Sequence, residues 1–326
     1  MRATIPCSLL SKPLACLLLG ASGVFMLPHS AQAGLKLDLA ISGGVRSDDL
    51  AWTIAGDVTG NNPNILSELI WSDVVIFQTK IQGSALINDK FFIRGSGAYG
   101  EVSSGDNDDF DYAGDDRTLL FSWSHNRAGG RVADLNVGFG LRSQGIDESN
   151  HRPWTVNWLV GYSQHEQNMR MTNGFQMFPA TGAFNRELNS TYNAMWKGPW
   201  FGADVWMAMS EKLAVTLTFE YHLADYTANA NWNLRDEFAH PVSYEHSAKG
   251  SGIFWSLGAN YQVTPPFRIA ALLEQHDWAT KAGIDRTYFV ENPFTGLPGN
   301  FSFETQLNEV RWESTALMLQ AVYSLK

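Results

Sequence analysis

Six aspartates in one short stretch are the first residues whose type and spacing suggest chemistry: Asp106, Asp108, Asp109, Asp111, Asp115 and Asp116, followed by Arg117. Carboxylates at this density offer the hard oxygen ligands that calcium prefers. The calcium-loop pattern fails, however, because Phe110 stands where a third ligand is needed and no glutamate closes the loop. Since salt screens exposed charges beyond about 8 Å, a solvated acidic loop is tolerable. We expect such a loop, attractive to cationic peptides, with a cation site as the alternative.

Two acid–histidine pairs have a spacing that places both side chains on one face of a strand. They are Glu220 with His222 and Glu274 with His276, each two residues apart. Such pairs can ligate a metal, but this spacing arises often by chance in strands. We therefore expect ordinary charge pairing, with no metal and no cofactor.

The composition favours β structure. The chain has 326 residues, of which 13% are aromatic and only 17% charged, and it carries 33 acids against 23 bases. This balance excludes a disordered chain, a coiled coil and a nucleic-acid binder with a basic surface. The 12 tryptophans and 29 glycines indicate many short strands, turns and aromatic belts.

The start of the chain has the features of a secretory signal peptide. Arg2 and Lys12 form a basic region, a short apolar run follows, and Ala31-Gln32-Ala33 matches the small-x-small cleavage pattern. Both cysteines lie in this segment. We predict a signal peptide over residues 1–33 and one exported, cysteine-free domain over residues 34–326.

Period-2 alternation with an unusually aromatic apolar face recurs along the exported domain. From Leu213 to Leu223 every second residue is apolar or aromatic, and residues 154–163, 253–262 and 316–326 repeat the pattern. A soluble sandwich alternates too, but it keeps the apolar face inside and uses more charge outside. In a membrane barrel the apolar face meets lipid and aromatic rings lie at the two interfaces. The alternation therefore predicts an all-β, antiparallel transmembrane barrel.

We count ten strands, at roughly residues 35–53, 65–86, 90–102, 119–142, 154–170, 189–209, 213–227, 242–262, 267–280 and 307–326. Tight turns such as Ser210-Glu211-Lys212 alternate with longer polar loops near 54–64, 103–118, 171–188, 228–241 and 281–306. In bacterial barrels the short turns face the periplasm and the long loops face outward. We therefore expect a protein of the bacterial outer membrane with extracellular loops.

Several charged side chains fall on the predicted inner face of the barrel: Lys80, Arg94, Asp134, Glu220, His222, Arg268, Glu274 and His276. A barrel of this size must fill its interior with side chains. We expect a charge-paired plug, in preference to a catalytic interior or an open pore.

Three stretches resemble the omptins, outer-membrane endopeptidases built on a ten-stranded barrel: Ser67–Trp71, Tyr192–Gly202 and Asn260–Pro265. The resemblance spans most of the exported domain in the right order. It implies an active site at the extracellular rim, with a carboxylate pair on one wall, a His–Asp pair on the other and a nucleophilic water between them. It also implies binding of lipopolysaccharide, a lipid that activity would require. The basic side chains near the rim that suit its phosphates are Arg127, Arg131 and Lys197.

The first pair of the family is matched here. Asp109 and Asp111, followed by Tyr112, fit the omptin Asp-x-Asp-aromatic motif. On an extended rim this spacing places both carboxylates on one face, where they can share a proton or hold a water.

The second pair of the family has no match in three alignments of the loop after Leu223. Aligned forward from Tyr221, the Asp and His positions fall on Asn231 and Asn233. Aligned backward from residues 263–265, the Asp and His positions fall on Trp232 and Leu234. A third alignment, anchored on Asp236-Glu237 and Pro241, supplies the acid but puts Phe238 in place of the histidine. Asparagine cannot take a proton near neutral pH, so this wall lacks an activating base.

Three other histidines are candidates for the missing base. His240 and His246 lie in or just after the same loop, where we expect solvated side chains in preference to bases. His125 lies near the top of the fourth strand, where omptins also carry a histidine, so it fits the scaffold without implying chemistry.

Three functions remain open. The first is a non-proteolytic surface barrel with a binding or a structural role, whose partners would be outer-membrane lipid, cationic peptides or surface proteins, and no nucleic acid. The second is an active endopeptidase that uses Asp109 and Asp111 with His240 or His246 as base and cleaves at basic residues. The third is a narrow pore.

Overall fold

The computed structural model describes residues 34–149 and 151–325, so the predicted signal peptide lies outside the described residues. The secondary structure of the described part consists of β-strands, and within that part no helix is long and apolar enough to cross a membrane. The strands are β1 (Leu35–Ile54), β2 (Ser67–Ile87), β3 (Phe91–Gly114), β4 (Thr118–Ile146), β5 (Pro153–Phe178), β6 (Gly182–Ala183), β7 (Ser190–Ala208), β8 (Leu213–Asn231), β9 (Tyr244–Thr264), β10 (Phe267–Thr280), β11 (Gly283–Glu291) and β12 (Pro298–Leu325).

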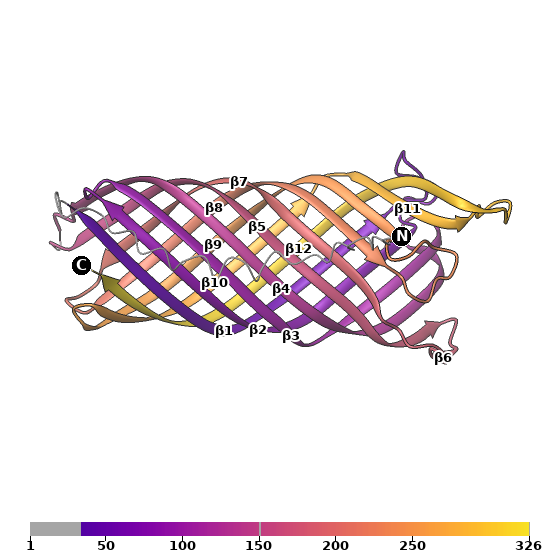
Figure 1. The fold of residues 1–326 in the computed structure, drawn as a ribbon, viewed down its shortest axis with the longest axis horizontal. Coiled ribbons are helices and arrows are strands. Elements are labelled where there is room, and N and C mark those ends of the chain that lie inside the picture. Colours follow the sequence, from indigo (N-terminus) through magenta and orange to yellow (C-terminus); the bar gives the residue numbers. More distant parts are fainter. Residues whose placement is uncertain (1–33, 150, 326) are drawn as a thin grey trace, which may run out of the picture. The chain divides into compact units, whose positions relative to one another are not determined.

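The strands close into a single antiparallel ring (Figure 1). Strand β1 pairs with both β2 and β12, which joins the first strand to the last. Strands β10 and β11 each pair with β9 and β12, so they are two segments of one barrel strand. The short β6 pairs only with β5. Within the described residues the ring therefore has ten strands, and the predicted ten-stranded barrel is confirmed.

The two ends of the barrel differ in their connections. At one end, Leu35 pairs with Ile87 and Leu37 with Leu325, so the first and last described strands end beside the β2–β3 turn. The opposite end carries β6 and β11 and the longer connections (Figure 1). The alternation of short turns and long connections follows the predicted pattern except between β3 and β4, where the predicted long loop is a turn of Asp115–Arg117.

Four of the five predicted loops are wrong in extent, because part of each is strand. Strand β3 runs through the acidic stretch to Gly114, and only Asp115–Arg117 turn the chain into β4. Strands β5, β8, β11 and β12 likewise extend into the stretches predicted as loops. The polar residues that suggested loops lie on strands that continue beyond the apolar surface of the barrel, where the outward face is polar as well.

An apolar belt surrounds the half of the barrel nearest the short turns. On β8 the outward residues from Leu213 to Leu223 are apolar and largely exposed, and the next outward residue is Asp225. On β9 the same change occurs between Ile253 and Ser251. Residues 213–223, at about 3.3 Å per residue and a tilt of about 40°, span about 25 Å, the height of a lipid-facing band.

The interior has two levels. Within the belt, charged side chains pair with one another across the lumen, as in Lys80–Glu274 at 2.8 Å. Beyond the belt lies an aromatic core of fully buried rings, made of Trp71, Trp196, Trp278, Trp312, Tyr192 and Tyr226. The charge-paired plug expected from the sequence is present, and the aromatic core above it was not foreseen.

An arginine on the belt tests its placement. Leu257→Arg puts a charge in the middle of the belt on β9, and we expect a loss of about 2–4 kcal/mol in the free energy of unfolding in phospholipid vesicles. Ser247→Arg lies on the same face of the same strand beyond the belt, and we expect a change within about 0.5 kcal/mol. Equal losses at the two positions would show that the belt does not face lipid.

Candidate functional site

The rim carboxylates Asp109 and Asp111 lie on the inner face of β3, beyond the belt. Asp109 pairs with Leu69 on β2 and with Ser124 on β4, and Asp111 pairs with Ser67 and Ser122. Both side chains are half-buried. Because they are two residues apart on a strand, they share one face.

The surroundings of this pair favour its protonated form. Burial and the charge of Asp111 raise the pKa of Asp109 to about 8, and burial also raises the pKa of Asp111. The Trp232 side chain lowers the pKa of Asp109 in part, and the positive charge of Arg235 offsets part of the rise at both carboxylates. The pair therefore holds a proton at neutral pH, as closely spaced carboxylates do.

The segment after β8 supplies the wall that faces the pair, and it contains no base in contact with Asp109. Asn231 ends β8 and its Oδ1 lies 2.7 Å from His240 Nδ1. Asn233 Oδ1 accepts hydrogen bonds from the Asn189 backbone and the Ser190 hydroxyl, so this side chain ties two connections together. Trp232 and Arg235, which the sequence analysis missed as site residues, are the groups that act on the carboxylates.

His246 corrects the expectation of a solvated loop residue. It lies on β9, directly opposite Asp285 on β11, and its side chain is fully buried. Its Nε2 is 3.2 Å from Asp285 Oδ1 and its Nδ1 is 2.9 Å from the Tyr192 hydroxyl. A His–Asp pair therefore exists beyond the belt, but on strands other than the family pattern implies.

The buried His–Asp pair is enclosed by aromatic rings. Trp52 and Tyr244 pack against His246 with ring centroids 5.0 and 5.1 Å away. Trp232 packs on Tyr244 at 4.8 Å, which connects this cluster to Asp109. Asp285 also accepts hydrogen bonds from Thr287 and Thr305. The run Thr287–Val290, β-branched and aromatic, is a strand signal that could have revealed β11 and hence Asp285.

The other candidate histidines have separate surroundings. His240 is exposed and contacts Asn231. His125 lies on β4 with its Nδ1 3.0 Å from Asp108 Oδ1, which also accepts the Trp123 indole N–H. Among the described residues, neither histidine forms a hydrogen bond or an ion pair with Asp109 or Asp111.

The six aspartates of the acidic stretch do not act as one cluster. Asp106 pairs with Arg127 at 2.5 Å, and Asp108 pairs with His125. Asp115 and Asp116 bind Asn64 at the turn. Among the residues that the structure describes, no three His, Cys, Asp or Glu side chains are grouped so that they could hold a metal ion.

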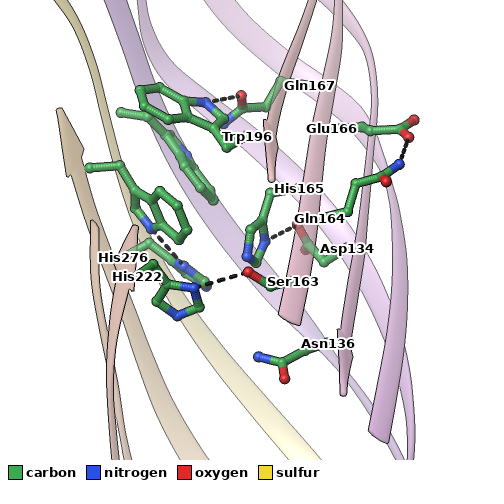
Figure 2. Close-up of polar contacts among 12 residues, drawn as sticks. Asp134, Asn136, Ser163, Gln164, His165, Glu166, Gln167, Trp196, His222 and His276 are labelled. Carbon is green, nitrogen blue, oxygen red and sulfur yellow. Dashed lines mark hydrogen bonds and ion pairs between the residues drawn. The ribbon is translucent and has the colours of Figure 1, made fainter. Parts of the chain in front are cut away.

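Glu220 and His222 belong to a polar network of the lumen, in which Figure 2 shows His222 beside Ser163, whereas Glu274 pairs with Lys80 and His276 accepts the Trp278 indole N–H. Glu220 Oε2 lies 2.9 Å from His222 Nε2, and His222 Nδ1 lies 2.9 Å from the Ser163 hydroxyl. This Ser–His–Glu order matches that of a hydrolytic triad. All three side chains are buried, however, and Arg94 holds Glu220 in an ion pair at 2.5 Å. The chain of contacts therefore fits a structural network better than an accessible nucleophile.

The lipid-binding candidates differ in their availability. Arg127 is already paired with Asp106. Arg131 on β4 and Lys197 on β7 point outward at the edge of the belt. Among the described residues neither has an ion-pair partner.

The raised pKa of Asp109 predicts a pH dependence of stability. Between about pH 4 and pH 8 the folded chain holds a proton that the unfolded chain has released. The contribution of this proton to the free energy of unfolding is therefore complete below about pH 4 and is lost as the pH rises through about 8. The free energy of unfolding changes by no more than about 1.4 kcal/mol per pH unit through this group.

Asp109→Asn removes this titration, so we expect the free energy of unfolding to fall less between about pH 5 and pH 8 than in the parent chain. Denaturant unfolding at a series of pH values measures the slope. Asp106→Asn, on the outward side of the same strand, is the control. A slope unchanged by Asp109→Asn would show that the pair is ionised in the folded state.

Comparison with known proteins agrees with this architecture. The crystal structure of the outer membrane protease OmpT from Escherichia coli matches with a TM-score of 0.65 and 16% sequence identity, over 89% of this chain and 97% of that one. This likeness confirms an omptin-like fold and does not extend to activity.

Two other barrels match with low TM-scores. The translocator domain of the autotransporter NalP from Neisseria meningitidis gives 0.36 at 9% identity, over 90% of this chain and 89% of that one. A Pseudomonas aeruginosa FadL homologue gives 0.22 at 10% identity, over 89% and 90%. These scores are too low to support an inference about this chain.

No curated protein matches the chain. The profile of one family, described as Pom, Protochlamydia outer membrane protein, matches residues 40–325. This match covers nearly all of the barrel and agrees with a location in the outer membrane. The chain belongs to the Protochlamydia outer membrane protein family.

Proposed function

We propose that the chain is a non-proteolytic surface protein of the outer membrane, whose rim binds other molecules and does not cleave them. The observation that carries this proposal is that the groups of the facing segment that act on the charge of Asp109 are Trp232 and Arg235, and that Arg235 is itself paired with Glu237. An indole only donates hydrogen bonds, and a guanidinium is not deprotonated in proteins. Neither group can take a proton from a water held by the carboxylates.

The state of the carboxylates supports the same proposal. Burial and mutual repulsion keep a proton on the pair at neutral pH. A protonated pair is a weaker base than the ionised one. Activation of water at this rim would thus depend on a group from elsewhere.

The alternative is an endopeptidase in which His246, oriented by Asp285, is the base. The 3.2 Å contact between the two side chains favours this alternative. Against it, His246 is fully buried, its Nδ1 is bonded to the Tyr192 hydroxyl, and its Nε2 faces Asp285 but has no hydrogen-bond partner among the described residues. A substrate-bound water would have to displace the rings of Trp52 or Tyr244 to reach it.

A pore is the third candidate, and the aromatic core argues against it. Trp278 and Trp312 are buried, with ring centroids 5.6 Å apart, and Trp196 packs on Trp278 at 5.8 Å. Close-packed rings leave few voids larger than a water molecule. A solute could cross only if this core moved.

The barrel's asymmetry supports our proposal for its orientation and its partners. With the short turns in the periplasm, the rim and the acidic β3–β4 hairpin face the medium. The exposed carboxylates at Asp115 and Asp116 then attract cationic peptides or basic surface proteins. Arg131 and Lys197, at the edge of the belt, lie at the level of lipopolysaccharide phosphates.

A peptidase assay tests the central proposal. Purified protein reconstituted with lipopolysaccharide is incubated with a library of basic peptides, and we expect no cleavage above the background of an Asp109→Asn, Asp111→Asn double variant. Cleavage that disappears in this double variant would overturn the proposal. In that case His246→Ala and His240→Ala identify the base, because only the base should lower the rate by 100-fold or so.

Charge reversal tests the lipid contact. Arg131→Glu with Lys197→Glu removes two phosphate-binding cations, and we expect roughly a tenfold or greater loss of affinity for fluorescent lipopolysaccharide. Arg311→Glu, an outward position on β12 beyond the belt, is the matched control. If control and double variant lose the same affinity, the contact is a general effect of charge and not a site.

A further inference from the structure

We infer that the barrel interior holds a binding site for a small, neutral, polyhydroxylated solute of monosaccharide size, on a wall formed by Gln78, Asp134, Asn136 and His165. This site lies within the belt, on the opposite side of the aromatic core from the rim. It is therefore independent of whether the rim binds or cleaves.

The wall borders a cavity of about 480 Å³ inside the lumen. This volume falls within the range of roughly 300–1,000 Å³ found for small-molecule sites. The lining mixes charged and polar groups with the apolar side chains Phe92, Phe254 and Leu272. Such a mixture suits a ligand with both hydroxyl groups and C–H faces.

Four buried polar atoms of residues that line this cavity have no hydrogen-bond partner within the described part of the chain. They are Gln78 Oε1, Asn136 Oδ1, His165 Nε2 and Ser314 Oγ. Gln78, His165 and Ser314 are at least nine-tenths buried. Because an unsatisfied buried polar group costs free energy, a set of four calls for a bound partner.

The neighbouring carboxylates, Asp134 and Glu220, determine which atom of each amide is left without a partner. Gln78 Nε2 lies 3.4 Å from Asp134 Oδ2, and Asn136 Nδ2 lies 2.8 Å from Glu220 Oε2. A carboxylate only accepts hydrogen bonds, so each amide must turn its nitrogen toward it and leave its carbonyl oxygen free. Asp134 likewise takes the Nδ1–H of His165 at 2.9 Å, which leaves Nε2 as an acceptor in the neutral ring (Figure 2).

Hydrogen-bond acceptors thus remain without partners, while the charged donors beside them already have acidic partners. Arg46 pairs with Asp134 at 2.8 Å, Lys80 with Glu274 at 2.8 Å and Arg94 with Asp204 at 2.9 Å. The free acceptors are neutral amide oxygens and a ring nitrogen, which suit hydroxyl donors better than a cation. A ligand rich in hydroxyl groups fits this wall.

The cavity opens toward the short turns. Its lining extends to Asp38 and Arg268, whose side chains are 34% and 27% exposed near that end. At the other end Trp278 and Trp312 are buried and close the lumen. A solute therefore enters and leaves by the same end.

Titration with D-glucose tests the site in the full-length protein purified in detergent. We expect saturable binding in the roughly millimolar range by calorimetry, weakened about tenfold by Asn136→Leu and by Gln78→Leu. Gln275→Leu, on the outward face of β10, is the control and should bind as the parent does. The thermal midpoint without glucose shows that each variant is folded.

A structure determined with glucose covers the case in which a variant fails to fold. Density for the sugar beside Asn136 and His165 supports the site, whereas density for water alone overturns it. The inference also fails if glucose does not saturate, if neither substitution weakens binding, or if guanidinium binds at this wall and glucose does not.

Discussion

Wherever lipid surrounds the barrel, the strands must form a closed ring. Hydrocarbon offers no water to the backbone, so every N–H and C=O group within the belt must pair with a neighbouring strand. Pairing of β1 with β12 meets this requirement by leaving no free edge. Once the ring is closed, strand alternation sends every second side chain inward. The charged residues of the belt strands therefore meet inside the lumen, where they pair.

The aromatic core then divides the interior into two separate environments. Toward the rim, it supports Asp109, Trp232 and the buried His246–Asp285 pair. Toward the short turns, it forms the closed end of a polar cavity. The same rings that argue against a pore also allow the two compartments to have unrelated functions. The scaffold shared with OmpT thus fixes where the rim lies and leaves its chemistry to individual side chains.

The fold could be predicted from the sequence because the alternation is strong wherever strands contact lipid. The stripe from Leu213 to Leu223 and the turn at Ser210–Lys212 correspond to the outward face of β8 and to the β7–β8 turn. Beyond the belt the outward residues are polar, so the same strands lose their apolar stripe. For that reason the sequence suggested a loop at residues 103–118, where β3 and β4 continue.

The candidate site was predictable only in part. A local motif was enough to place Asp109 and Asp111 on one face, because residues two apart on a strand share a face. The partners of this pair and of His246 come from segments distant in sequence. Trp232 follows β8, and Asp285 becomes a neighbour of His246 only through the pairing of β11 with β9. Such contacts depend on strand register, which a single sequence does not reveal.

Spin-label accessibility measures whether lipid touches the apolar side of each strand. The barrel sequence has no cysteine, so single cysteines can be placed at Leu257 and Ser247 without background. In lipid vesicles, we expect a label at Leu257 to collide with oxygen and not with a water-soluble nickel complex, and the label at Ser247 to do the reverse. Equal access of the nickel complex to both labels would show that the apolar side of β9 does not face lipid.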